Sequence, residues 1–185
     1  MQWAVPNALH MTPITDPLII PIYWLFLSGL VLGTFVDFEH FIIPDSVTIG
    51  GMVVGPLLSA LVPALHGQTV WWQGLRCSVT GLAVGFGLLY AVGWLGTRAF
   101  KKEAMGFGDV KLLGAIGAFL GWKAVLFTIF ASSLLGSVAG LLLIAFGGVK
   151  MQSRIPFGPY ISMGATVWLF WGEKILALYI GLMRP

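Results

Sequence analysis

The sequence has few charged residues and almost no cysteine. Asp, Glu, Lys and Arg make up 9% of its 185 residues, and only one residue is a cysteine, Cys77. Since a soluble domain carries about a quarter charged residues, this composition excludes an ordinary soluble protein. A single cysteine also excludes a disulfide within the chain and a zinc site built from several thiolates.

The sequence is also short of clustered positive charge. Its formal net charge is +3, but the Lys and Arg residues are scattered singly between apolar segments. Scattered basic residues in short loops are typical of membrane proteins, in which they set the orientation. We therefore expect a lipid bilayer around the chain and no nucleic-acid partner.

Long apolar segments are what the sequence does contain. Hydrophobic residues make up 58% of the chain, and its mean hydropathy is +0.93. A helix needs about 20 residues to cross the hydrocarbon core of a bilayer. The sequence thus predicts an all-α, polytopic membrane helix bundle with about six transmembrane helices. We place them at about 18–36, 46–65, 77–97, 109–122, 124–149 and 160–182.

The rest of the organisation follows from these segments. Residues 1–17 contain three prolines and are predicted to be an irregular or interfacial lead-in, and residues 18–185 a single membrane domain. In the third segment, glycines are expected to allow close helix packing; they are Gly81, Gly85, Gly87 and Gly93.

The distribution of Lys and Arg predicts the orientation, because these residues are more frequent in cytoplasmic loops. With six spans, the segments 37–45, 98–108 and 150–159 lie on one side. The basic residues of that side are Arg98, Lys101, Lys102, Lys150 and Arg154. Those of the other side are Arg76, Lys123, Arg184 and, at the end of a span, Lys174. The excess predicts that the first three segments face the cytoplasm.

Two acidic residues stand at the ends of predicted spans on that face. The fourth span, from Asp109 to Trp122, covers only about 21 Å as a helix, so Asp109 is expected near lipid depth. A carboxylate there costs about 2.5–3.5 kcal/mol, which argues against an unpaired structural role. Asp37 ends the first span, and Pro44 then prevents a simple continuation of the helix. The two acids could therefore face each other.

Such a pair of carboxyl groups could carry hydrolytic chemistry. They would share a proton, hold a water, deprotonate it against a peptide carbonyl and protonate the leaving amine. This chemistry needs no metal and no cofactor. Gly106 and Gly108 would then allow an unusual backbone or pairing with an extended substrate. The alternative is that Asp109 caps the fourth helix and that both glycines are ordinary loop residues.

Neighbouring residues allow more than one interpretation. Asp45 or Ser46 is interpreted as the N-cap of the second span. Lys111 either neutralises Asp109 or extends to the headgroups. The stretch from Ser153 to Tyr160 is either a connector or a wall of the site. A metal site formed by Asp37, Glu39 and His40 is conceivable, but without a nearby pair of histidines we predict no metal.

Three motifs in order resemble one known family. "VDFEHFIIPD" at 36–45, "GFGDVK" at 106–111 and "IPFGP" at 155–159 are similar to the type IV prepilin peptidases, bacterial leader peptidases of the GxGD aspartyl class. The resemblance extends from about Leu25 to about Trp168. It implies a multi-pass endopeptidase of the bacterial inner membrane with its site on the cytoplasmic face. Such an enzyme removes basic leaders from type IV prepilins and type II secretion pseudopilins, after a glycine and before the hydrophobic helix.

The resemblance also implies roles for single residues. It assigns catalysis to Asp37 and Asp109. Acidic residues would attract the basic leader, chiefly by assisting encounter. The expected substrate-binding residues are Glu39, Asp45, Glu103, Gly106, Gly108, Lys111, Pro156, Phe157 and Gly158.

The chain departs from many members of that family in one respect. They carry a further membrane segment and a cytoplasmic domain with two CxxC pairs, and they N-methylate the new pilin terminus with S-adenosylmethionine. A chain with one cysteine is expected to lack that domain, so the methyltransferase activity is not carried over. It resembles either a short, peptidase-only form or part of a longer chain.

Two other function classes remain open at this level, and the oligomeric state is not predicted. A proton-coupled transporter would use the same intramembrane acids to relay protons, although it would more often show internal symmetry. A catalytically silent assembly subunit of a secretion system is the third class. Cleavage of a prepilin would separate the three.

Overall fold

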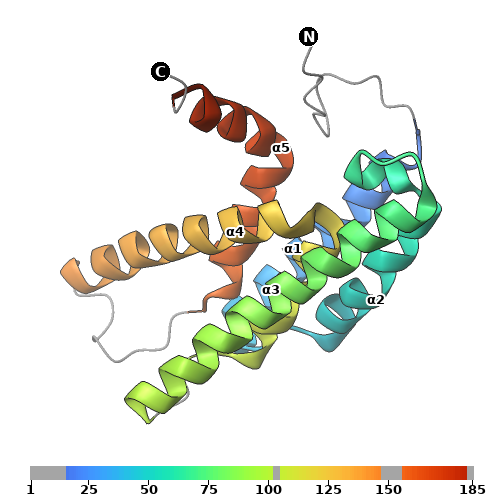
Figure 1. The fold of residues 1–185 in the computed structure, drawn as a ribbon. Helices are drawn as coiled ribbons and strands as arrows, with labels where there is room; N and C mark the ends of the chain where they lie inside the picture. The colour runs from blue at the N-terminus through green and yellow to red at the C-terminus, as the bar shows by residue number, and fades with distance from the viewer. Residues whose placement is uncertain (1–15, 102–104, 147–155, 183–185) are drawn as a thin grey trace.

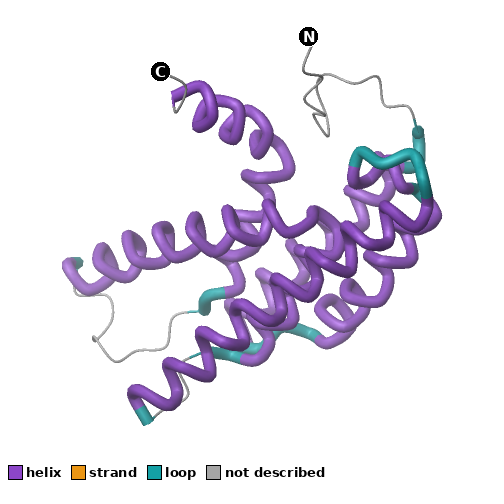
Figure 2. Tube along the Cα trace, in the orientation of Figure 1, coloured by secondary structure: helices purple, strands orange, loops and turns teal. Residues whose placement is uncertain are grey.

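The described part of the chain is helical throughout. A computed structural model describes residues 16–101, 105–146 and 156–182, and these ranges contain no β-strand (Figure 2). The elements are α1 (Ile19–His40), α2 (Asp45–Leu61), the short 3-10 helix η1 (Pro63–His66), α3 (Trp71–Phe100), α4 (Phe107–Ala145) and α5 (Gly158–Leu182) (Figure 1). The predicted all-α class is confirmed. Most of the predicted lead-in, residues 1–15, lies outside the described residues.

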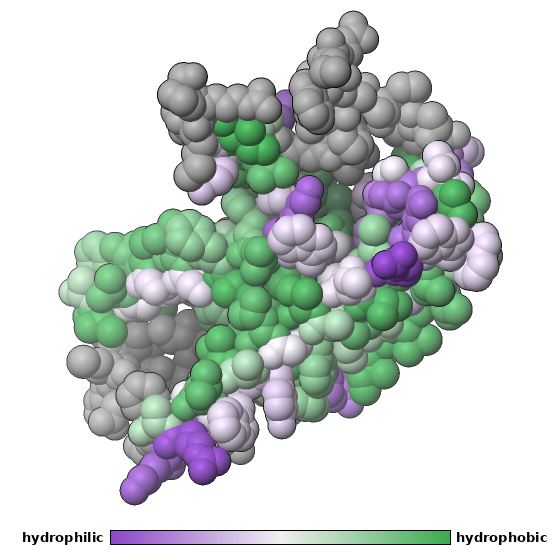
Figure 3. Space-filling view, viewed as in Figure 1, coloured by the Kyte–Doolittle hydropathy of each residue, from purple (hydrophilic) through white to green (hydrophobic). Residues whose placement is uncertain are grey.

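Among the residues that the structure describes, α1, α3 and α4 are long and apolar enough to cross a membrane. Helix α2 is apolar but shorter, with 17 residues. Large apolar side chains such as Trp24, Leu61 and Phe130 are mostly exposed, as expected for side chains that face lipid rather than water. Figure 3 shows apolar residues over the middle of α3 and hydrophilic residues gathered near its two ends. The apolar surface of the helices therefore agrees with the predicted membrane bundle.

The predicted fourth and fifth spans are two helical segments that meet at a break at Gly121, close to the predicted boundary near residue 123. They form the single helix α4, with 39 residues, interrupted at Gly121. Gly121 has φ 81° and ψ 173°, a conformation that residues with a Cβ rarely adopt. Helix α4 changes direction in the part that contains this residue (Figure 1). A single glycine thus forms the break between the two segments.

The first half of α4 lies at the centre of the bundle because α3 packs against it with almost no intervening side chains. A Cβ at Gly81 would overlap the carbonyl oxygen of Gly117, and one at Gly85 would overlap that of Leu113. The hydroxyl of Ser78 also donates a hydrogen bond of 2.6 Å to the carbonyl oxygen of Ala118. The expected close packing is confirmed at Gly81 and Gly85. At Gly87, where a Cβ would meet nothing within 4 Å, it is wrong.

Candidate functional site

Asp37 lies in the last turn of α1 and is buried, with 5% of its surface exposed. The helix ends at His40 because Phe41 adopts a left-handed conformation with φ 55°, and the Phe41 N–H bonds to the Asp37 carbonyl oxygen at 3.0 Å. The chain then turns, and α2 begins immediately after Pro44. The predicted stop of the first span before Pro44 is therefore confirmed.

The Asp37 carboxylate is bound by the first residue of α5. The backbone N–H of Gly158 donates a hydrogen bond of 3.0 Å to its Oδ2 atom. The first N–H groups of a helix have no partner within the helix, and a negative charge there is favoured by the helix dipole. Gly158 is also tightly enclosed, since a Cβ would lie 2.6 Å from the same oxygen. Residues 121 positions apart are thus fixed to each other.

Phe157 of the "IPFGP" stretch contacts different neighbours from Gly158. The Phe157 ring packs beside Gly136 in the second half of α4, where a Cβ would lie 3.3 Å from that ring, and it also contacts the Tyr160 ring. Pro156, immediately before it, is half-buried. Of the residues predicted from this stretch, Gly158 is the one with a contact to a predicted catalytic acid.

Asp109 is in the first turn of α4 and is 9% exposed. The N-cap of that helix is Gly106, and no side chain makes a capping hydrogen bond there, so the interpretation of Asp109 as a helix cap is wrong. Its carboxylate instead lies back over Gly106, where a Cβ would be 3.3 Å from Oδ2. The Asp109 and Asp37 carboxyl groups are near enough to interact electrostatically.

Neither glycine of the "GFGD" motif has an unusual backbone, which corrects that expectation. Gly106 has φ −67° and ψ 135°, which any residue can adopt, and Gly108 belongs to the first turn of α4. Gly108 is nevertheless closely approached, because a Cβ there would lie 3.4 Å from the Cβ of Ile43. The segment that approaches Gly108 closely is therefore the protein's own connector between α1 and α2.

Ile43 was not singled out from the sequence, although three helices meet on its side chain. It is 5% exposed. Cβ atoms built at Gly33 of α1, Gly108 of α4 and Gly158 of α5 would lie 3.5, 3.4 and 3.0 Å from atoms of Ile43. Ile43 therefore fills the space where the helices carrying both acids come together. In the sequence, an apolar residue directly before a proline in a short connector was the signal that could have identified it.

Asp45 and Lys111 form an ion pair across the mouth of this site. The Nζ of Lys111 lies 2.7 Å from Oδ1 of Asp45 and 5.1 Å from the centre of the Phe107 ring. The structure thus places Lys111 against Asp45, a partner that neither sequence interpretation foresaw. Helix α2 begins at Asp45, its N-cap is Pro44, and no side chain caps it. The interpretation of Asp45 or Ser46 as N-cap is therefore wrong.

The remaining predicted residues are more peripheral. The side chains of Glu39 and His40 are 75% and 66% exposed, with Oε2 and Nδ1 3.9 Å apart. Glu103 lies outside the described residues. Within residues 16–101, 105–146 and 156–182 no group of three or more His, Cys, Asp or Glu side chains could hold a metal ion.

Comparison with known proteins identifies the family of the chain. Residues 17–141 match the type IV leader peptidase family. The chain belongs to this family. It is 32% identical over 84% of its length to a prepilin leader peptidase/N-methyltransferase of Stutzerimonas stutzeri, and 35% identical over 82% to one of Aeromonas salmonicida. This leader peptidase family member covers 51% and 49% of those relatives, about half their length. No solved structure matches the chain.

Proposed function

We propose that this chain is a membrane endopeptidase that removes basic leader peptides from type IV prepilins and related pseudopilins, with Asp37 and Asp109 as its catalytic pair. Family membership and the names of the relatives support the reaction class. One structural observation carries the assignment of residues. The ends of α1 and α4 bring two buried carboxyl groups into electrostatic range of each other, around Ile43 and Gly158.

The chemistry follows from two carboxyl groups in different protonation states. One carboxylate takes a proton from a water, and the water oxygen forms a bond to the carbonyl carbon of the scissile peptide. The other, protonated, donates to the carbonyl oxygen, where negative charge develops. The C–N bond then breaks as the first carboxyl group passes the proton from water to the nitrogen and the second recovers its own, which leaves a carboxyl group on the leader and an amine on the mature protein.

The surroundings of the two acids give them unequal roles. Oδ2 of Asp37 accepts a hydrogen bond from Gly158 N–H at 3.0 Å, which fixes its orientation and favours its ionised form. Asp37 is thus the proposed base that holds the water. Asp109 is the proposed acid toward the substrate carbonyl. The site is proposed to face the cytoplasm from the inner membrane, in keeping with the Lys and Arg distribution.

Cleavage by the purified full-length chain in detergent tests this function. The substrate is a synthetic precursor with a basic leader, a glycine at the cut and an apolar helix, and mass spectrometry identifies the products. We expect one cut, after the glycine. Intact precursor after long incubation would contradict the proposal. Proton flux without cleavage in liposomes would favour the transporter instead.

A further inference from the structure

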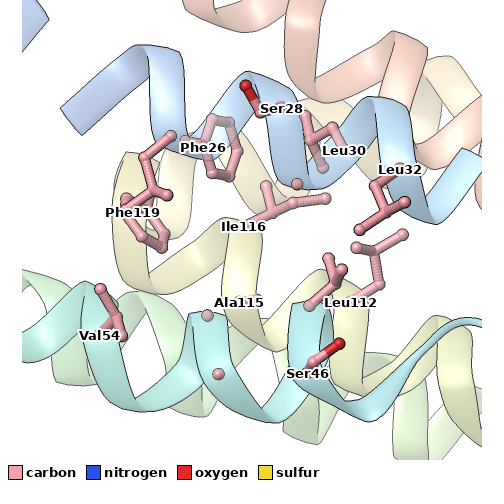
Figure 4. A pocket seen from close by; sticks show the side chains of 15 residues that line it. Phe26, Ser28, Leu30, Leu32, Ser46, Val54, Leu112, Ala115, Ile116 and Phe119 are labelled. Carbon is pink, nitrogen blue, oxygen red and sulfur yellow. The ribbon is translucent and has the colours of Figure 1, made fainter. Parts of the chain in front are cut away.

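Helices α1 and α2 diverge on one side of the molecule and leave a groove between them. Figure 4 shows α1 along one wall and α2 along the other, with α4 between them as the floor. The groove has a volume of about 390 Å³. Its floor includes Leu112, Ile116 and Phe119, which are 2%, 0% and 3% exposed. It is therefore built on the rigid centre of the bundle.

The walls of the groove suit an apolar helix. Leu25 and Leu32 on the α1 wall are 56% and 52% exposed, so the groove opens through an apolar rim, as a lateral opening to lipid would. Glycines on the walls leave room for a backbone to approach, as at helix contacts in membranes. A Cβ at Gly50 would meet nothing within 4 Å, and one at Gly29 would meet only Val47, at 3.6 Å.

The groove continues from the two acids. Leu32 precedes Asp37 by five residues on α1, and Leu112 follows Asp109 by three on α4, which are distances of about 7.5 and 4.5 Å along the helix axes. At the far end, Phe119 lies about 15 Å from Asp109 along α4. A chain cut at the acids and then helical would place its residues from about 4 to about 10 beyond the cut along the groove.

The charges at the end of the groove beside Asp37 and Asp109 suit a basic segment that precedes an apolar helix. Glu39 has 75% of its side chain exposed there, and Asp45, although it is paired with Lys111, has 65% exposed. The C-terminal end of α1, at His40, adds the negative end of its helix dipole. A lipid acyl chain would use the apolar groove but not this acidic end next to the two buried carboxyl groups. A peptide with cations before an apolar helix would use both.

We propose that this groove receives the apolar helix of the precursor, in the register given above, while its basic leader lies over the acidic end. The inference rests on the proposed function and adds the binding surface for the substrate. The affinity for the precursor then comes mainly from contacts in the groove, whereas Asp37 and Asp109 carry out the reaction. A substrate that lacks the helix is expected to bind weakly but to be cut at the same bond.

A matched pair of glycines tests the groove. Gly50→Leu fills it, whereas Gly87→Leu adds the same side chain on α3, at a position where a Cβ would also meet nothing within 4 Å. For the helix-bearing precursor we expect Gly50→Leu to raise KM by about tenfold or more, the worth of one buried apolar side chain. A short peptide that ends soon after the cut should be cleaved equally by both variants. Equal KM values of both variants for the precursor would overturn the proposal.

Photo-crosslinking separates the occupants and keeps this test independent of cleavage. A photoreactive residue at Gly50 should capture the precursor at a residue about 4 to 10 beyond the cut. The same group at Gly87 should capture it far less. Capture of lipid alone at Gly50, with precursor present in excess, would overturn the proposal in favour of an acyl-chain site. If the wild-type chain cut no substrate, the proposed function would fail, and the crosslink would still decide the groove.

Discussion

The backbone N–H of Gly158 donates a hydrogen bond of 3.0 Å to Oδ2 of Asp37, joining the start of α5 to the end of α1. This contact makes Asp37 both a proposed catalytic base and the carboxylate that satisfies the first turn of α5. On the proposed function, activity and the anchoring of α5 are therefore coupled. The variants below are chosen so that the two effects can be told apart.

Asp37→Asn and Asp109→Asn should each reduce cleavage by about 100-fold to 10,000-fold, because an amide can neither accept the proton from water nor return one. Asn can still accept the Gly158 N–H, so Asp37→Asn should leave α5 anchored. Initial rates with the synthetic precursor measure the loss. Asp16→Asn is the matched control, since Asp16 contacts Leu18 just before α1 begins. Undiminished cleavage by either variant would remove that residue from the catalytic pair.

Gly158→Ala should lower both stability and activity. The new Cβ would lie 2.6 Å from the Asp37 carboxylate and 3.0 Å from Ile43, and such overpacking costs about 1–3 kcal/mol. Gly181→Ala is the control in the same helix, because its Cβ would meet nothing within 4 Å. Thermal unfolding in detergent and initial cleavage rates measure the two effects. If Gly158→Ala behaves like Gly181→Ala in both assays, the close contact at Asp37 does not form in the working protein.

Asp45→Asn and Lys111→Met should have equal and small effects on stability. The Asp45 side chain of this ion pair is 65% exposed, and exposed ion pairs contribute about 1 kcal/mol or less. The double variant should be no less stable than either single one, since both remove the same contact. Denaturant unfolding of the four proteins measures this cycle. A large loss of cleavage in Lys111→Met alone would show instead that Lys111 acts on Asp109.

His66 should make the protein less stable as the pH falls. It lies in η1, between α2 and α3, and burial lowers its pKa from 6.5 to about 4, although a hydrogen bond to the Ala118 backbone opposes the shift. Its ring also lies 3.0 Å from the Ser59 hydroxyl. Between pH 6.5 and 4 the unfolded chain binds a proton at this residue that the folded chain does not. The contribution is therefore complete above pH 6.5 and is lost toward pH 4.

Thermal unfolding at pH 7, 5.5 and 4 measures this effect in wild type and His66→Gln. Glutamine keeps a polar group near Ser59 but does not titrate. The midpoint of wild type should fall relative to that of the variant as the pH decreases, by about 2–4 °C for each kcal/mol lost. Parallel midpoints across this range would show that His66 is not buried as a neutral residue.

Much of the fold follows from local pattern. Apolar segments of helical length predicted the helices, and the Pro44 ring explained why α1 cannot run into α2. The break inside α4 was predicted to within about two residues, but its exact position was not, because a sequence does not reveal which glycine adopts a positive φ. Gly121 does so, whereas Gly117, four residues earlier, is used for contact with α3. Both are glycines in the same apolar segment, and only the packing distinguishes them.

In the candidate site, too, some features could be predicted from the sequence and others only from the tertiary structure. The sequence by itself determined that carboxylates stand at the ends of apolar helices, since a charge in such a place is costly without a use. Only the tertiary structure decided their partners: Gly158 for Asp37, Asp45 for Lys111, and Ile43 as the side chain on which three helices meet. Helix formation depends on neighbours a few residues apart, whereas these contacts join residues up to 121 positions apart. Such contacts arise from how whole helices pack, which no local pattern encodes.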